Sequence, residues 1–192
     1  AGREEELAYQ IAKRSKEIKR DIETAITNNY AASAGTNATA RRMGSIEAWL
    51  TTNSQRGTGG ASGGFTAAGT VTVCGDATST NQRTFTEARL KVAIKACWSS
   101  GGEPTLVVLG PVSKQKGSAF SGITTKYSDF GANPSSSGGL SIIGAADIYL
   151  SDFGRLKLAP SRFSRERTAL VLDMSYWSLH YLRPFSVIPI AK

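Results

Sequence analysis

The stretch EELAYQIAKRSKEIKRDIETAI, residues 5–26, decides the fold, because its apolar residues recur with the period of an α-helix. The residues on one side of the helical wheel, within about 100° of arc, are Leu7, Ile11, Ile18, Ile22, Ala25 and Ile26. Most Lys and Arg residues lie off that stripe, and the acidic residues at 4–6 suit a helix N-terminus. We therefore expect one helix over residues 4–34, about 45 Å long, with a single narrow apolar edge.

The segment that follows is short and polar. In SIEAWL, residues 45–50, the i, i+3, i+4 spacing of Ile46, Trp49 and Leu50 predicts one or two helical turns. Residues 51–83 are rich in Gly, Ser and Thr, which predicts a long loop with room for a small β-ribbon. Within it, RGTGGASGG (56–64) lacks the spacing of either phosphate-binding glycine motif, so we expect a flexible surface loop there.

A second helix is expected to begin at a capping box formed by Thr84 and Glu87. Its apolar face would consist of Leu90, Ile94, Cys97 and Trp98, and the glycines at 101–102 would end it. The run TLVVL (105–109) predicts a buried strand, and Pro111 suits the first position of a short helix reaching about residue 120. Residues 131–139, GANPSSSGG, predict a flexible loop.

The last third has the patterns of strands. An apolar segment over 140–150 runs into a turn at 152–154, and residues 155–158 then alternate between basic and apolar up to Pro160. Residues 168–172 predict another strand, and the alternation over 177–181 predicts one more. The fold class is therefore α+β, with a long helix, smaller packed helices and a mostly antiparallel sheet.

The composition is that of a globular protein, with 192 residues, 40% hydrophobic and 20% charged. It predicts one domain, or at most two, and no apolar run is long enough to cross a membrane. The first residues are charged and lack a Met, so we expect a fragment or a processed product. Cys74 and Cys97 are expected to be free thiols, and too few Cys and His are present for a structural zinc site.

The net charge of +8 resides entirely in residues 35–192, because residues 1–34 are neutral. The densest basic run is Arg155, Lys157, Arg162, Arg165 and Arg167, interrupted among charged residues only by Glu166. Such a run can meet phosphate, an anionic membrane or an acidic protein. A solvated surface without a partner is an equally good interpretation.

A search for catalytic groups finds none, so we predict no enzyme and no catalytic, cofactor-binding or metal-binding residue. Asp147 and Asp152 have odd spacing, which sends them to opposite faces of a strand, and neither Asp129 nor Asp173 has an obvious partner. His180 is the sole histidine, and the G-x-S-x-G motif of serine hydrolases is absent. We expect His180, which shares a strand face with Ser178, to be a structural or surface residue.

Several stretches together resemble the major capsid (head) proteins of tailed phages and prophages. The most specific are WLTTN (49–53) with RGTGG (56–60), the turn DIYLSDFG (147–154) and the run YWSLHYLRPF (176–185). Further matching stretches are residues 5–26, FTEARL (85–90) and VVLGP (107–111), so the resemblance spreads over nearly the whole chain.

The resemblance implies the Hong Kong phage capsid fold. Residues 1–50 would be the spine helix and short helix of the peripheral domain, 51–83 the loop, 84–174 the axial domain, and 175–192 a strand returning to the periphery. Family members carry about a hundred more residues upstream and continue past Phe185, so we expect this chain to lack both ends. No residue matches the crosslinking chemistry of some phages with this fold.

The function implied is a structural subunit that assembles with copies of itself, as pentamers and hexamers, into an icosahedral shell around phage DNA. Portal, scaffold and decoration proteins are further candidate partners, no membrane is involved, and the location is the virion after assembly in the host cytoplasm. Two alternatives stay open: a nucleic-acid-binding module that uses residues 155–167, and, ranked last, a hydrolase that uses His180.

Overall fold

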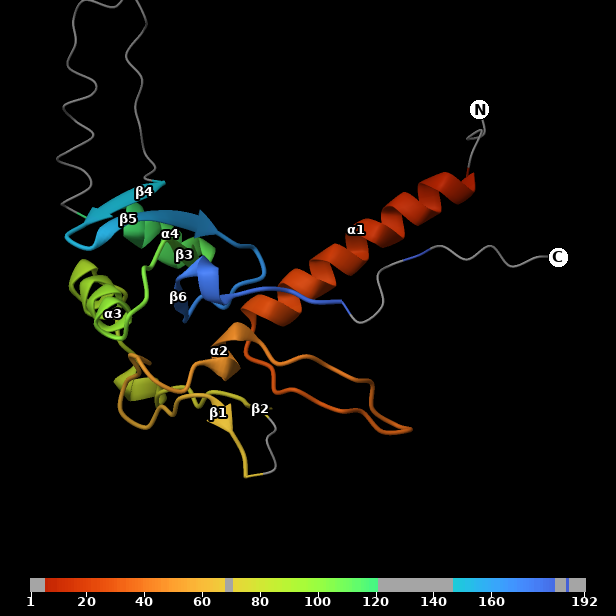
Figure 1. Ribbon diagram of the computed structural model, residues 1–192, viewed down its shortest axis with the longest axis horizontal. Helices are drawn as coiled ribbons and strands as arrows, with labels where there is room; N and C mark the ends of the chain where they lie inside the picture. Colours follow the sequence, from red (N-terminus) through yellow and green to blue (C-terminus); the bar gives the residue numbers. More distant parts are fainter. Residues whose placement is uncertain (1–5, 68–70, 121–146, 182–185, 187–192) are drawn as a thin grey trace, which may run out of the picture.

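The computed structural model describes residues 6–67, 71–120, 147–181 and 186 (Figure 1). Its α-helices are α1 (Glu6–Thr27), α2 (Ile46–Trp49), α3 (Glu87–Ser99) and α4 (Pro111–Ser118), with 3₁₀ turns η1 (Ser79–Asn81) and η3 (Met174–Tyr176). Its strands are β1 (Gly64–Phe65), β2 (Val71–Thr72), β3 (Leu106–Leu109), β4 (Ile148–Ser151), β5 (Gly154–Pro160) and β6 (Ala169–Leu172). The expected α+β class is confirmed.

Four strands form a mixed sheet in the order β4-β5-β3-β6. The hairpin β4–β5 and the pair β3–β6 are antiparallel, whereas β3 and β5 run parallel. The expected alternation on β5 is confirmed, because Leu156 and Leu158 are buried while Arg155 and Lys157 are exposed. Strands β1 and β2 form a separate antiparallel ribbon within the Gly-rich region.

The core lies between one face of this sheet and two helices. Leu90 and Ile94 of α3 pack with Val107 and Leu109 of β3 and with the two leucines of β5. The short helix α4 covers the same face, and its Gly117 approaches Leu109 and Leu158. At the end of α3, Gly101 adopts a φ of +88° and the Gly102 N–H donates to the Cys97 carbonyl, so the expected glycine stop is confirmed.

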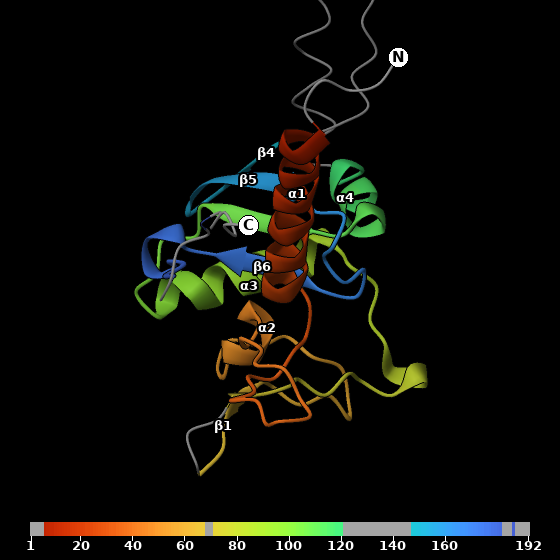
Figure 2. The same cartoon turned by 90° about the vertical axis from the view of Figure 1, so that its right-hand side faces the viewer.

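Helix α1 projects away from the rest of the molecule (Figures 1 and 2). With 22 residues it is about 33 Å long, and Thr27 in its last turn is the residue of α1 that is buried. Leu7 is 75% exposed and Ile18 is 37% exposed. The apolar stripe expected from the sequence is therefore present, but this chain leaves its first turns uncovered.

The helix ends seven residues before the expected position, 34, and the contacts of Asn29 and Tyr30 supply the reason. Asn29 uses its side-chain amide to pair with the backbone of Cys74 in both directions, at 2.8 and 2.9 Å. The Tyr30 N–H donates a hydrogen bond to the Ser45 hydroxyl at 3.0 Å. These bonds replace the next helical hydrogen bonds and send the chain into an excursion over residues 30–45, joined by a bridge between Ser33 and Arg42.

Two further expectations are wrong in detail. Helix α3 has Thr86 as its N-cap and begins at Glu87, and its N-cap makes no side-chain hydrogen bond, so Thr84 and Glu87 form no capping box. The Glu87 carboxylate instead pairs with Lys91 and accepts from the Tyr149 hydroxyl, both at 3.0 Å, which holds it away from the N-cap.

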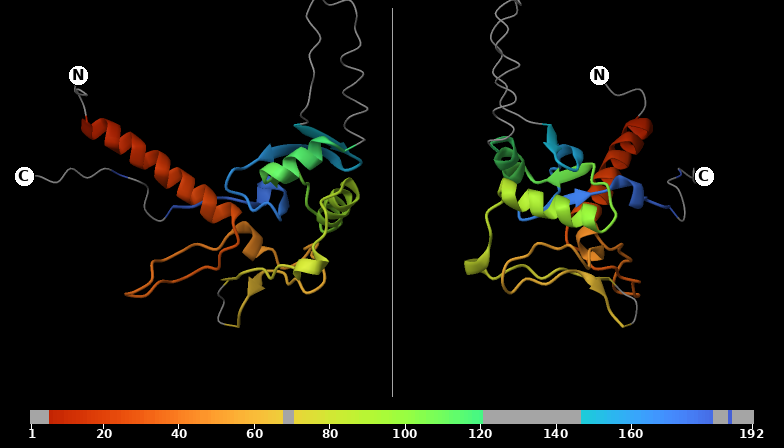
Figure 3. Two further views of the ribbon diagram at one scale, coloured as in Figure 1. Left: turned by 180° about the vertical axis from the view of Figure 1, so that it is seen from behind. Right: turned by 60° about the vertical axis from the view of Figure 1, so that its left-hand side comes forward.

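The strand expected over 177–181 is also absent. After β6, Asp173 caps η3 by accepting from the Ser175 N–H, and the chain then leaves the sheet on the side from which α1 projects (Figure 3). The alternation of Trp177, Leu179 and Tyr181 therefore reflects no sheet pairing within the described residues. The loop expected over 131–139, the segment 140–146 and residues 182–185 lie outside the described residues.

Candidate functional site

The most unusual side chain among the described residues is Glu47, a carboxylate in α2 that is 1% exposed. Its two oxygens accept hydrogen bonds from two arginines and a threonine. Arg56 donates to Oε1 at 3.1 Å, and Arg165 donates to Oε2 at the same distance. Thr168 also donates to Oε2, at 3.2 Å. A buried carboxylate is tolerated only when it is paired in this way.

Arg165 extends the network to a second carboxylate. Its other terminal nitrogen donates to both oxygens of Asp76, at 2.7 and 2.5 Å, and Arg167 approaches the same group at 3.6 Å. Burial opposes the charge on Arg165, but its hydrogen bonds and attraction to Asp76 and Glu47 outweigh that penalty and raise the pKa of the guanidinium. Arg165 therefore remains a fixed cation at all relevant pH values.

The network joins segments that lie far apart in the chain. The Cys74 thiol donates to the Glu47 carbonyl at 2.9 Å, and the pairing of Asn29 with the Cys74 backbone links this point to the end of α1. Burial raises the pKa of the Cys74 thiol, so this cysteine stays protonated as a donor. Both cysteines are free thiols, as expected.

A second bond fastens α1 to the segment that follows the sheet strand β5. The Ser161 hydroxyl donates to Glu23 Oε1 at 2.8 Å. Together with Arg165, this bond ties residues 161–168 to both α1 and α2. We call the set Glu23, Glu47, Arg56, Asp76, Ser161 and Arg165 the junction network, because it connects the projecting helix and the Gly-rich region to the sheet.

Two glycines of the Gly-rich run 56–64 pack closely on neighbouring backbone, while residues 58, 59, 61 and 62 are exposed, as expected for a surface loop. A Cβ at Gly63 would lie 2.3 Å from the Ala48 carbonyl oxygen, and one at Gly57 would lie 2.3 Å from the Asn81 carbonyl oxygen. Only a hydrogen in place of a side chain allows these approaches. The glycines thus let the run lie against the backbone of α2, where Arg56 reaches Glu47.

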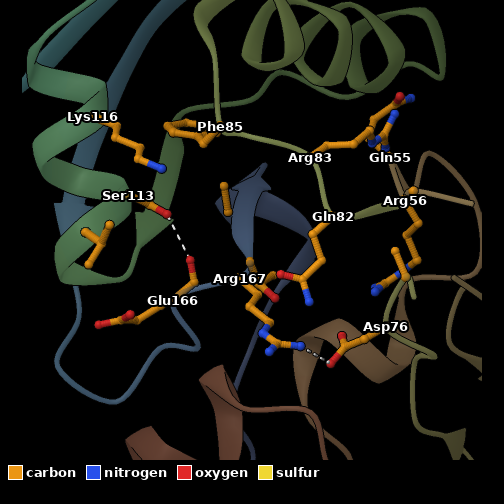
Figure 4. Close-up of a pocket in the computed structure, with 15 residues that line it drawn as sticks. Gln55, Arg56, Asp76, Gln82, Arg83, Phe85, Ser113, Lys116, Glu166 and Arg167 are labelled. Atoms are coloured by element: carbon orange, nitrogen blue, oxygen red, sulfur yellow. Dashed lines mark hydrogen bonds and ion pairs between the residues drawn. The ribbon is translucent and has the colours of Figure 1, made fainter. Parts of the chain in front are cut away.

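Beside the junction network lies a pocket of about 270 Å³ (Figure 4). Segment 55–57, segment 76–85, α4 and the start of β6 form its walls. Its lining includes four cationic side chains and two carboxylates, namely Arg56, Arg83, Lys116, Arg167, Asp76 and Glu166. The Ser113 hydroxyl closes one side by donating to the Glu166 carbonyl at 3.0 Å. The pocket therefore carries an excess of positive charge.

The structure divides the basic run predicted at 155–167. Arg155 and Lys157 are exposed on β5, and Arg162 is exposed in the following segment. Arg165, in contrast, has a side chain only 17% exposed and is neutralised by Glu47 and Asp76. The run is not one continuous basic face, because its most buried member serves the junction network.

The other candidate residues are placed apart from one another. Asp147 pairs with Lys114 at 3.1 Å, and Asp152 is exposed in the β4–β5 turn. His180 is exposed, as expected, and shares a 2.8 Å hydrogen bond with Ser178, although the strand whose face they were expected to share is absent. Asp129 lies outside the described residues.

Asp173 accepts hydrogen bonds from the Ser175 hydroxyl and from the backbone N–H groups of Ser175 and Glu103. Those bonds, led by that of the Ser175 hydroxyl, lower the pKa of the Asp173 carboxyl. Its role is thus to fix the turn that leads out of β6.

No group of three or more His, Cys, Asp or Glu side chains among the described residues is arranged to hold a metal ion. No helix in the described part of the chain is both long and apolar enough to cross a membrane.

Sequence reasoning missed Glu47, the centre of the junction network. The spacing of Ile46, Trp49 and Leu50 favoured these as the buried face of α2, yet Trp49 is 46% exposed, while Glu47 and Ala48 are buried. A four-residue helix has too few turns for periodicity to identify its buried side. The partner of Glu47, Arg165, lies 118 residues further along the chain, and the sequence alone gives no means of pairing the two.

Comparison with known proteins gives one family. The family model described as SU10 major capsid protein matches residues 1–192, the whole chain. A search of curated proteins finds no significant match.

Proposed function

This chain belongs to the SU10 major capsid protein family and is therefore a structural phage capsid protein. We propose that it is a subunit that assembles with its own copies into an icosahedral shell around phage DNA. The family implies contact between copies in the capsid and a location in the virion. The closed shell, its pentamers and hexamers, the enclosed DNA and assembly in the host cytoplasm are the proposed part.

The observation that carries the proposal is the uncovered stripe of α1. Leu7 is 75% exposed, Ile18 is 37% exposed, and the helix projects beyond the body of the chain (Figure 1). An amphipathic helix gains most of its stability by burying its apolar face, so a stripe left in water favours a partner. In a shell built from one protein, a neighbouring copy is the available partner.

We further propose that the chain has the Hong Kong phage capsid fold, with α1 as the spine helix. The sheet, α3 and α4 would form the axial domain over residues 84–174, while residues 1–50 and 175–192 would belong to the peripheral domain. The junction network lies where the two proposed domains would meet. It joins α1 and α2, on the peripheral side, to residues 161–168, on the axial side, and this position supports the division. It would act as the fixed joint that sets the angle between the two parts.

Exposed cationic side chains would attract the phosphates of the packaged DNA without recognising its sequence. The exposed cations of the basic run, Arg155, Lys157 and Arg162, are available for this, whereas Arg165 is already paired. Portal, scaffold and decoration proteins remain proposed partners. A dedicated nucleic-acid-binding module is disfavoured, because the run that motivated it is split by the junction network.

Electron microscopy of the full-length protein, expressed alone and concentrated, tests the proposal. We expect rings, sheets or shells, since heterologous contacts between copies close into rings. Monomers that persist under every condition of salt and concentration would contradict it.

A further inference from the structure

The pocket beside the junction network holds cations that this chain leaves uncompensated. Arg56 and Arg167 approach Glu47 and Asp76, respectively. Lys116 and Arg83 have no ion-pair partner among the described residues, and Figure 4 shows the Lys116 side chain directed into the pocket. The third carboxylate in this region, Glu166, lies on the outer side, away from Arg167 (Figure 4). A ligand with a negative charge is therefore favoured here.

The register of the sheet places this pocket at one end of the strands. Ala169, which lines the pocket, pairs with Leu109, and Leu109 pairs with Pro160 at the end of β5. The β4–β5 turn, with the exposed Asp152, lies beyond Gly154 at the other end of β5. Gly154 and Pro160 are six positions apart along the strand, so the pocket and the turn are about 20 Å apart.

We propose that the pocket receives the Asp152 turn of a neighbouring copy, whose carboxylate pairs with Lys116. This inference rests on the proposed self-assembly and names one of its contacts. Complementary features at opposite ends of one subunit produce a heterologous, head-to-tail contact, which forms a ring when the rotation between successive copies closes. The chain cannot satisfy the pair by itself, because the sheet holds the two ends apart.

The shape and lining of the pocket favour a protein carboxylate over DNA phosphate. A concave site of about 270 Å³ admits a side chain or a tight turn, whereas a DNA duplex presents a convex surface to exposed cations. Phe85 and Val112 line the pocket as well, and these apolar groups suit the carbon atoms of a peptide turn. Arg155 and Lys157, exposed on β5, are better placed for phosphate.

Charge reversal in the full-length protein tests the contact, with assembly followed by sedimentation and electron microscopy. We expect Lys116→Glu and Asp152→Lys each to raise the concentration needed for assembly by about tenfold or more, because each places like charges together. The double variant restores an opposite-charge pair and should recover most of the loss. Lys95→Glu, an exposed lysine of α3 outside the pocket, is the matched control.

Each outcome decides the question. Unchanged circular dichroism and thermal unfolding of the single variants show that they fold. Normal assembly of Lys116→Glu, equal loss in Lys95→Glu, or no recovery in the double variant would overturn the pairing. Normal assembly with weakened DNA binding would assign the pocket to phosphate instead and also overturn it. If the unmodified chain fails to assemble, self-assembly itself is contradicted, which distinguishes the two failures.

Discussion

Arg165 and Glu47 lie 118 residues apart in the sequence and are joined by an ion pair of 3.1 Å between Nη1 and Oε2. Both side chains are largely removed from water, at 17% and 1% exposed. The pair fixes the segment after β5 to the short helix α2. Together with the hydrogen bond from Ser161 to Glu23, it connects the sheet to both α1 and α2.

The first prediction concerns this pair. Replacing Glu47 by Ala leaves Arg165 and Arg56 without their buried partner, which should lower the free energy of unfolding by about 3–5 kcal/mol. Urea unfolding followed by circular dichroism measures it. Glu17, whose pair with Arg14 is exposed, provides the control, because Glu17→Ala should cost less than about 1 kcal/mol. Equal effects of the two substitutions would contradict a structural role for the junction network.

The second prediction concerns the Gly-rich run. Gly63→Ala places a methyl group 2.3 Å from the Ala48 carbonyl oxygen, so it should destabilise the protein by about 1–3 kcal/mol. Gly117→Ala is the matched control, since its methyl group meets atoms only at 3.7 Å or beyond. In the last turn of α4 that change should be neutral or stabilise by up to about 1 kcal/mol. A tolerated Gly63→Ala would mean that the run is loosely packed after all.

The third prediction is a dependence of stability on pH through Asp173. The hydrogen bond from the Ser175 hydroxyl and two backbone donors lower the pKa of this carboxyl from its ordinary value of 3.8. Its contribution is therefore present above that value and is lost as the pH falls through the lower folded-state pKa. Asp173→Asn should lose stability at neutral pH and show a weaker fall on acidification. Parallel thermal-unfolding profiles for both proteins would contradict this origin.

The fourth prediction concerns the uncovered stripe of α1. Leu7→Glu should weaken assembly, because it places a charge where a neighbouring copy would bury an apolar group. Stability of the isolated chain should change by less than about 0.5 kcal/mol, since Leu7 is 75% exposed. Sedimentation and thermal unfolding measure the two effects. Lys13→Glu, on an exposed position of the same helix, controls for charge alone.

The fifth prediction concerns DNA. If Arg155 and Lys157 meet phosphate, replacing either by Ala should reduce the log–log salt slope of binding to duplex DNA by about 1. Arg167→Ala, in the pocket, should leave the slope unchanged. Binding titrations over a series of salt concentrations give the slope. Equal slopes for all variants would remove the exposed residues of β5 as DNA contacts.

Patterns that repeat over several turns or strands were predictable from the sequence. The stripe of α1, the alternation of β5 and the glycine stop after α3 depend on neighbours within a few residues, so local periodicity determines them. The Pro111 start of α4 follows from the same kind of local rule. The whole-chain resemblance to phage major capsid proteins was likewise visible in the sequence and is confirmed by the family match.

Only the tertiary structure decided where α1 ends, which residue of α2 is buried and what Arg165 does. The end of α1 depends on Cys74, which lies 45 residues beyond Asn29, and the burial of Glu47 depends on two arginines from separate loops. Hydrogen bonds and ion pairs between distant segments leave no periodic trace, because each partner is an ordinary polar residue in its own surroundings. Folding brings such residues together, and their charges are balanced only there.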